Sequence, residues 1–185
     1  DGSQNSNDDC FYVDDIPFTG VSGNIAYNSA TTGAGGGLYT GGGNVSITAA
    51  NIAYNTANTG GGGLYANGGT TTMTKGVIEY NEASEGGGIY ANGGTVEVNY
   101  ANAGDGSIRY NYASLRGGGL YISASGRLNL KGKATLTKNH VPLGSMGGGV
   151  YLLGTVQAGA SATDVITVAD NFAANTSDPA SYTPV

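Results

Sequence analysis

Short segments in which apolar and polar residues alternate recur along most of the chain. The clearest marker is a Gly-Gly-Gly-aliphatic-Tyr block that occurs five times, with its tyrosines at Tyr39, Tyr65, Tyr90, Tyr121 and Tyr151. Subtraction of these positions gives steps of 26, 25, 31 and 30 residues. Repeats of this length indicate a solenoid, in which each turn packs on its neighbours.

Each repeat contains three alternating segments, all as short as a β-strand. The first reads Ile-x-Tyr-Asn at 25–28, 52–55, 78–81 and 108–111, and more loosely at 136–139. Because successive side chains of a strand point to opposite faces, we expect the Ile and the Tyr to point inward and the residue between them outward.

The other two segments follow the glycines. One lies at 38–40, 64–66, 89–91, 120–122 and 150–152, and its alternation turns the aliphatic residue inward and the Tyr to solvent. The third lies at 45–47, 71–73, 96–98, 128–130 and 156–158, again with the inner positions mostly apolar. The sequence therefore predicts an all-β, single-domain, right-handed parallel β-helix of about five to six coils with three short strands per coil.

Two columns of turn residues repeat with the strands. Glycine gives positive φ and close approach of neighbouring coils, so we assign a structural role to Gly36, Gly62, Gly87, Gly118 and Gly148. Asparagine tolerates left-handed geometry and hydrogen-bonds nearby backbone, and its amides can also form a ladder from coil to coil. We assign a structural role on these grounds to Asn28, Asn55, Asn81, Asn111 and Asn139.

The two ends of a solenoid must be capped, because an open coil presents unpaired backbone groups to which another strand can add. We expect an N-terminal leader and cap at 1–20, coils at 21–160, and a final partial coil with a tail at 161–185. The candidate residues for capping or assembly are Cys10, Phe11, Tyr12, Val13, Ile16 and Phe18.

Composition narrows the functional classes. The 185 residues are 39% apolar and carry a formal charge of −6, which argues against phosphate-backbone binding. The sequence contains no apolar run of about 18 residues that would span a bilayer, and it begins without Met, so we expect an extracellular or cell-surface location. Cys10 is the only cysteine, so we expect either a buried free thiol or a disulfide to another molecule.

Catalytic and cofactor sites are not predicted. His140 is the only histidine and lies in a predicted loop, so a solvent-facing or structural role is expected. Glu79 and Arg109 occupy matching positions of adjacent turns and are expected to form an ion pair, whereas Glu97 and Arg127 lie apart from them. A weak calcium candidate, against the alternative of a solvated polar end, is formed by Asp8, Asp9, Asp14 and Asp15.

The repeated Gly-Gly-[Gly/Ala]-[Ile/Leu/Val] and aromatic-plus-Asn motifs extend over about residues 24 to 152. In this they resemble the repeats of polymorphic outer-membrane proteins and related autotransporter-type adhesins. The resemblance implies a right-handed parallel β-helix at the cell surface.

Two functional hypotheses follow. The first is a non-catalytic extracellular structural protein, either an adhesin module or a self-assembling fibre subunit, whose partners are other copies of itself, with surface glycans as a second class. It would act through its coil ends and through the five tyrosines of the glycine blocks, unless those rings serve only to cover the glycine turns. The alternative is a carbohydrate-binding or polysaccharide-cleaving β-helix.

Asn44 and Asn175 are candidate glycosylation sites.

Overall fold

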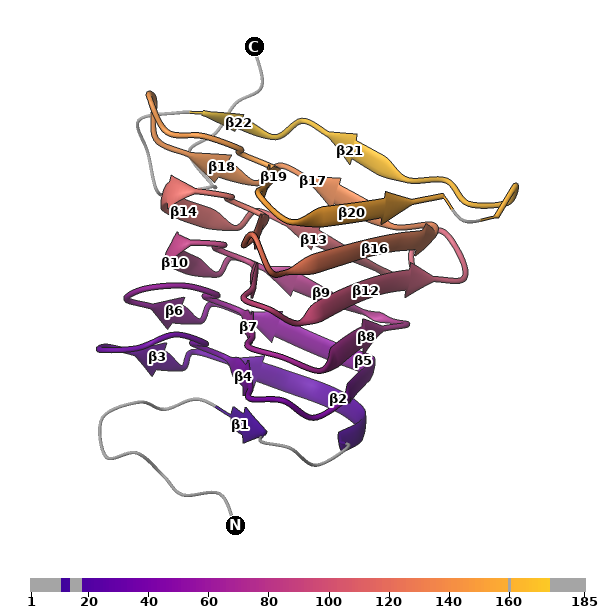
Figure 1. Ribbon diagram of the computed structural model, residues 1–185, viewed down its shortest axis with the longest axis horizontal. Helices are drawn as coiled ribbons and strands as arrows, with labels where there is room; N and C mark the ends of the chain where they lie inside the picture. Colours follow the sequence, from indigo (N-terminus) through magenta and orange to yellow (C-terminus); the bar gives the residue numbers. More distant parts are fainter. Residues whose placement is uncertain (1–10, 14–17, 160, 174–185) are drawn as a thin grey trace.

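The computed structural model describes residues 11–13, 18–159 and 161–173. These residues form a right-handed parallel β-solenoid of about six turns (Figure 1). Every strand pairing among them is parallel, and the strands fall into three sheets, which we name A, B and C. The predicted fold class is therefore confirmed.

Sheet B contains the strands that follow the glycine blocks. Its members, in spatial order, are β1 (Phe11–Val13), β4 (Leu38–Thr40), β7 (Leu64–Ala66), β11 (Ile89–Ala91), β15 (Leu120–Ile122) and β19 (Val150–Leu152). The register places each Tyr beside the Tyr of the next turn, and it extends to β1, where Tyr12 pairs with Tyr39. Part of the expected cap segment is thus the first strand of this sheet, while Cys10 and Ile16 lie outside the described residues.

Sheet A consists of very short strands that follow the Asn column, and the sequence analysis did not predict them. They are β3 (Ser29–Ala30), β6 (Thr56–Ala57), β10 (Glu82–Glu85), β14 (Tyr112–Arg116), β18 (His140–Val141) and β22 (Phe172–Ala173). The small side chains of Ala30, Ala57 and Ala83 pack together beneath this sheet. Alanine lacks the strand propensity that would have marked these segments.

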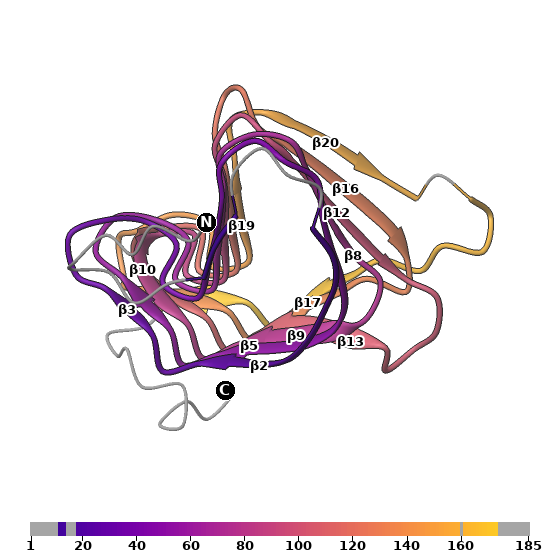
Figure 2. The ribbon, with the colours of Figure 1, turned by 90° about the horizontal axis from the view of Figure 1, so that it is seen from below.

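Sheet C joins the other two predicted strand types. In the first turns one strand spans both, as in β2 (Phe18–Ala26) and β5 (Val45–Ala53), whereas later turns divide it. The divided strands are β8 (Thr70–Met73), β9 (Gly76–Glu79), β12 (Thr95–Tyr100), β13 (Gly106–Arg109), β16 (Arg127–Gly132), β17 (Thr135–Thr137), β20 (Thr155–Ala158) and β21 (Thr167–Ala169). Figure 2 shows the turns lying over one another, with sheet A on a lobe opposite β12 and β16.

The core is a set of apolar columns that run through the stacked turns. The inward positions of the Ile-x-Tyr-Asn segments and of the glycine blocks are confirmed, because Ile52, Ile78, Leu64 and Ile89 are all fully buried. Each column contributes similar side chains at successive turns, and such stacking fills a narrow interior without large voids.

The prediction that the Tyr of the Ile-x-Tyr-Asn segment points inward is wrong. Tyr27, Tyr54, Tyr80 and Tyr110 have left-handed φ values of 62°, 56°, 54° and 55°. A left-handed residue interrupts the period-two alternation, so the ring leaves the core and Tyr27 is 79% exposed. The following Asn turns inward instead, and Asn55 is fully buried.

The predicted amide ladder along the Asn column is confirmed. The Nδ2 group of each Asn donates to Oδ1 of the Asn one turn later over 2.9–3.0 Å, from Asn28 through Asn139 to a sixth member, Asn171. The Nδ2 of Asn55 also donates to the carbonyl of Ile25, and the pattern repeats at later turns. Left-handed geometry, the other predicted role, belongs to the preceding residue.

The glycine column serves two different needs. The first Gly of each block, such as Gly86 at φ 60°, has a left-handed backbone. The second Gly instead lies against the next turn, since a Cβ on Gly87 would come within 2.1 Å of the carbonyl oxygen of Tyr112. The third Gly is also close to the next turn, since a Cβ on Gly88 would lie 2.6 Å from the carbonyl oxygen of Gly119, so the predicted close approach of coils applies to the second and third positions.

His140 does not lie in a loop. It belongs to β18 and is fully buried, with its ring stacked on Phe172 at 5.1 Å and tilted against Tyr112 at 4.9 Å. Its predicted structural role is confirmed, and the solvent-facing alternative is wrong.

Candidate interaction surface

The five tyrosines of the glycine blocks form one continuous stack along sheet B, which we call the tyrosine stripe. Successive ring centroids lie 5.1, 5.0, 4.5 and 5.4 Å apart. At this spacing each ring covers the faces of its neighbours, so the stripe presents ring edges and hydroxyl groups rather than open faces. The stripe consists of Tyr39, Tyr65, Tyr90, Tyr121 and Tyr151.

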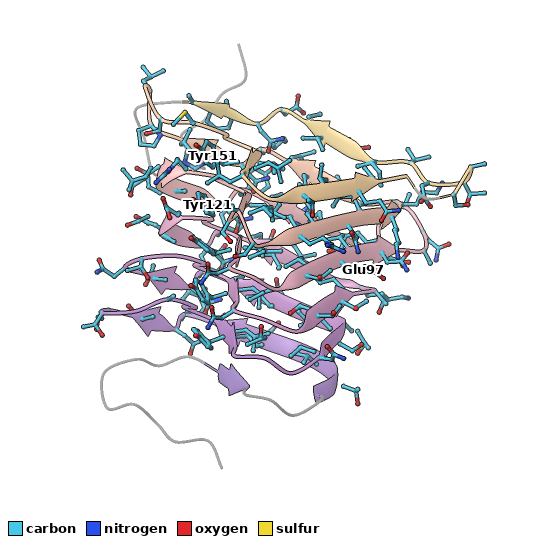
Figure 3. All side chains as sticks on the ribbon, viewed as in Figure 1. Glu97, Tyr121 and Tyr151 are labelled. Carbon is cyan, nitrogen blue, oxygen red and sulfur yellow. The ribbon has the colours of Figure 1, made fainter. Side chains whose placement is uncertain are left out.

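Exposure varies along the stripe. Tyr39, Tyr65, Tyr90 and Tyr151 are half-buried, whereas Tyr121, expected to face solvent, is only 5% exposed. The guanidinium carbon of Arg116 lies 5.6 Å from the ring centroid of Tyr121 and 5.4 Å from that of Tyr151. Tyr121 is therefore enclosed between two tyrosines and covered by a cation, and Figure 3 labels it beside Tyr151.

A second, shorter amide ladder fixes the hydroxyl groups of the stripe. Asn67 donates to the Tyr39 hydroxyl over 3.0 Å, and Asn92 donates to both the Tyr65 hydroxyl and Oδ1 of Asn67 over 2.9 Å. Burial nevertheless raises the pKa of the Tyr65 phenol. This ladder was not predicted, although its signal is present in the repeated Tyr-Ala-Asn-Gly-Gly at 65–69 and 90–94.

A groove of about 290 Å³ lies between the stripe and sheet A. Its lining residues are Asn58, Thr59, Gly60, Tyr65, Ser84, Glu85, Tyr90 and Leu115. A Cβ on Gly60 would lie 2.5 Å from the Tyr90 ring, so this ring covers the glycine turn, as the architectural alternative predicted. Burial and the neighbouring Tyr121 raise the pKa of the Tyr90 phenol.

Acidic side chains beside the groove and on sheet C are paired with cations. Glu85 contacts Arg116 at the edge of the stripe. The predicted pair of Glu79 and Arg109 is confirmed at 2.9 Å. A further ion pair joins Lys131 to Glu97, which Figure 3 labels, over 2.7 Å. Another joins Lys75 to Asp105 over 3.5 Å. Arg127 is exposed. A carboxylate held by a cation is poorly suited to act as a general acid.

Metal-binding clusters and membrane-spanning helices are both absent from the part of the chain that the structure describes. Within 11–13, 18–159 and 161–173, His, Cys, Asp and Glu side chains do not gather in groups of three or more that would hold a metal ion. The same ranges contain no helix that is long and apolar enough to cross a bilayer. The predicted calcium candidates Asp8, Asp9, Asp14 and Asp15 lie outside these ranges.

The left-handed tyrosines form a second stack on another face of the solenoid. Tyr27, Tyr54, Tyr80 and Tyr110 lie 5.0–5.1 Å apart, with ring planes within 3° of parallel. The next residue in this column is Lys138, also left-handed, whose Nζ lies 5.4 Å from the Tyr110 ring centroid. A cation therefore ends the stack at its C-terminal side.

Among the described residues, the C-terminal turn has apolar core positions that are exposed. Strand pairing places Leu152, Val156 and Val168 directly after the buried Ile122, Leu128 and Leu136. Their exposed fractions are nevertheless 40%, 49% and 53%. Figure 1 shows β19 to β22 as the last layer of the stack among the described strands.

The N-terminal turn contains four of the six predicted assembly residues among the described strands. Phe11, Tyr12 and Val13 form β1, and Phe18 begins β2, so these strands and β3 are the edges of sheets B, C and A at this end. Asn44, a candidate glycosylation site, is exposed and accepts a hydrogen bond from the backbone N–H of Thr70, while Asn175 lies outside the described residues.

The chain matches no protein-family model, no curated protein and no solved structure.

Proposed function

We propose that the chain is a non-catalytic structural protein of the cell exterior that self-assembles through its coil ends. The observation that carries the proposal is the open C-terminal turn, where Leu152, Val156 and Val168 hold core positions and remain exposed. A core position exposed to water loses the stabilisation that burial would give it. An added strand layer would restore that burial and pair the edge backbone groups.

The surface chemistry supports a structural role over a catalytic one. The carboxylates of Glu79, Glu85 and Glu97 are each paired with a Lys or Arg. The two tyrosine stacks and the Asn ladder are regular, repeated features that stabilise turn against turn. The repeat-level resemblance to polymorphic outer-membrane proteins and autotransporter-type adhesins supports a cell-surface location.

The experiment that tests this function measures assembly directly. Sedimentation velocity over a wide concentration range, with electron microscopy of the same samples, should show oligomers that lengthen as concentration rises. The double variant Val156→Asp/Val168→Asp should remain monomeric, because buried carboxylates would oppose the added layer. Leu143→Asp, at another exposed apolar residue, is the matched control and should assemble normally.

Two results would count against the proposal. A wild-type chain that stays monomeric at high concentration would contradict assembly. Equal loss of assembly in Leu143→Asp would show that any added charge prevents association, and that the coil end has no special part.

Carbohydrate binding is the second candidate, and the groove beside the stripe is the observation that favours it. Tyr65, Tyr90, Ser84 and Glu85 give the groove ring edges, a hydroxyl and a carboxylate. Since the ring faces are covered, recognition would depend on hydrogen bonds rather than on stacking against sugar rings. A glycan-binding screen with wild type and Ser84→Leu tests binding, and product release abolished in Glu85→Gln would indicate cleavage.

A further inference from the structure

The two ends of the solenoid are complementary in strand order, in core columns and in hydrogen-bonding direction. Resting on the self-assembly proposed above, we propose that a second copy of this chain adds head to tail and in register. The last turn of one copy, β19 to β22, then lies parallel to the first turn of the next, β1 to β3.

Strand order makes the two ends fit. Among the described strands every turn passes through sheet B, then sheet C, then sheet A, beginning with β1 and reaching β22. A second copy that begins in sheet B therefore continues the winding where β22 leaves it. Sheets A and B each gain one strand pair, and in sheet C β2 of the next copy pairs with both β20 and β21, so every described strand edge at this junction is paired.

The apolar columns continue across the same junction. The column of Leu152 contains Val13 in the first turn, the column of Val156 contains Phe18, and the column of Val168 contains Ile25. Apolar positions would therefore meet apolar positions in all three columns. Burial of the exposed Leu152, Val156 and Val168 provides the driving force for association.

The Asn ladder gives the junction a direction. Each Asn from Asn28 to Asn139 donates its backbone N–H and its Nδ2 to Oδ1 of the Asn one turn later. Asn171 is the last described member, and its Nδ2 donates to the carbonyls of Leu136 and Ala169, whereas the Asn residues of inner turns give one of these two bonds to the next Asn. In a head-to-tail stack Nδ2 of Asn171 would exchange its bond to Ala169 for one to Oδ1 of Asn28, the first member, in the next copy. Head-to-head or tail-to-tail contacts would break this donor-to-acceptor order.

Engineered disulfides test both direction and register. Thr19 and Gln157 are exposed residues of one column in sheet C, at its first and last turns. In the proposed stack they lie on neighbouring strands, about 4.8 Å apart, which is within the reach of a disulfide. In a Cys10→Ser background, Thr19→Cys/Gln157→Cys should give a ladder of covalent oligomers on oxidation.

Further variants fix the register. Asn24→Cys/Thr167→Cys uses a second column of sheet C and should also cross-link. The mismatched variant Thr19→Cys/Thr167→Cys is the negative control. Strands β2 and β5 each contain residues of both columns, but Thr19 and Thr167 belong to different columns, so this variant should not cross-link. The corresponding serine variants control for folding and for assembly without a disulfide.

Every other outcome contradicts the head-to-tail stack, and each one points to a different arrangement. Dimers from Gln157→Cys alone indicate tail-to-tail contact, and dimers from Thr19→Cys alone indicate head-to-head contact. Assembly of the wild type with no cross-link in either matched pair places the interface elsewhere, while the proposed function stands. A monomeric wild type that assembles only after deletion of 174–185 identifies that segment as the occupant of the end. A monomer in every case defeats the proposed function itself.

Discussion

The side-chain amide and the backbone N–H of Asn55 both donate to Oδ1 of Asn81, each over 3.0 Å. Asn81 in turn makes the same two bonds to Asn111, and its Nδ2 also reaches the carbonyl of Ile52. One buried side chain thus satisfies polar groups of the preceding and the following turn and links three successive turns. The ladder occupies the corner where the chain leaves sheet C, a position at which strand pairing alone does not satisfy the backbone.

Replacement of Asn81 should therefore be costly. In Asn81→Ala the buried N–H of Asn55 and the carbonyl of Ile52 each lose a partner, and the expected loss of unfolding free energy is about 2–4 kcal/mol. Urea unfolding followed by circular dichroism measures it. The exposed Asn58→Ala is the control and should change stability by less than about 0.5 kcal/mol. Similar midpoints for the two variants would contradict the importance of the ladder.

The left-handed tyrosines lead to a prediction about strain. Tyr80 has φ 54° and stacks between Tyr54 and Tyr110. Tyr80→Ala loses the stacking and keeps the strain, whereas Tyr80→Gly loses the stacking and relieves the strain. The glycine variant should therefore be more stable than the alanine variant by about 1 kcal/mol, as measured by urea unfolding. Tyr65 has an ordinary φ, so there the alanine variant should be more stable than the glycine variant. If the glycine variant were the more stable one at both sites, backbone strain would be excluded as the cause.

The ion pair between Glu79 and Arg109 should contribute modestly to stability. Its atoms lie 2.9 Å apart on paired strands, and the side chains are 16% and 43% exposed. A double-mutant cycle with Glu79→Gln and Arg109→Gln should give a coupling of about 0.5–1 kcal/mol at low salt, and most of it should vanish at 1 M NaCl because ions screen partly exposed charges. A coupling that persists at high salt would indicate a packing effect instead.

The sequence predicts the solenoid well because identical residues recur at one register position in each turn. The block around Leu64 and Tyr65 repeats with its faces intact, so periodicity alone identifies the core column. The position of Tyr54 could not be predicted in the same way, because one left-handed residue reverses the expected faces and its φ is not encoded in the apolar pattern.

The candidate surfaces were predicted less completely than the fold. The tyrosine stripe follows from alternation, but the enclosure of Tyr121 depends on Arg116, which reaches it from sheet A. Likewise the contact of Asn92 with the Tyr65 hydroxyl depends on a turn geometry that joins residues 27 positions apart. Such contacts arise from the stacking of turns, and the sequence of one repeat does not contain them.

Tyr100 provides a prediction about alkaline stability. Its ring is fully buried, its hydroxyl donates to the carbonyl of Gly76 over 3.1 Å, and burial raises the pKa of its phenol above the ordinary value of about 10. The unfolded chain therefore releases this proton more readily than the folded chain. The corresponding stabilisation is complete below about pH 10 and is lost progressively as the pH rises toward the pKa of the folded state.

Tyr100→Phe removes both the hydrogen bond and this proton. Near pH 8 the variant should be less stable than wild type by about 1 kcal/mol, because the carbonyl of Gly76 loses its donor. Between pH 10 and pH 12 the wild type should lose stability faster, so the difference should narrow or reverse in urea unfolding at each pH. Tyr27→Phe, which removes an exposed hydroxyl, is the control. A difference for Tyr100→Phe that stays constant from pH 8 to pH 12 would show that this phenol ionises equally in the folded and unfolded chains, which is incompatible with its enclosure beneath Gly106.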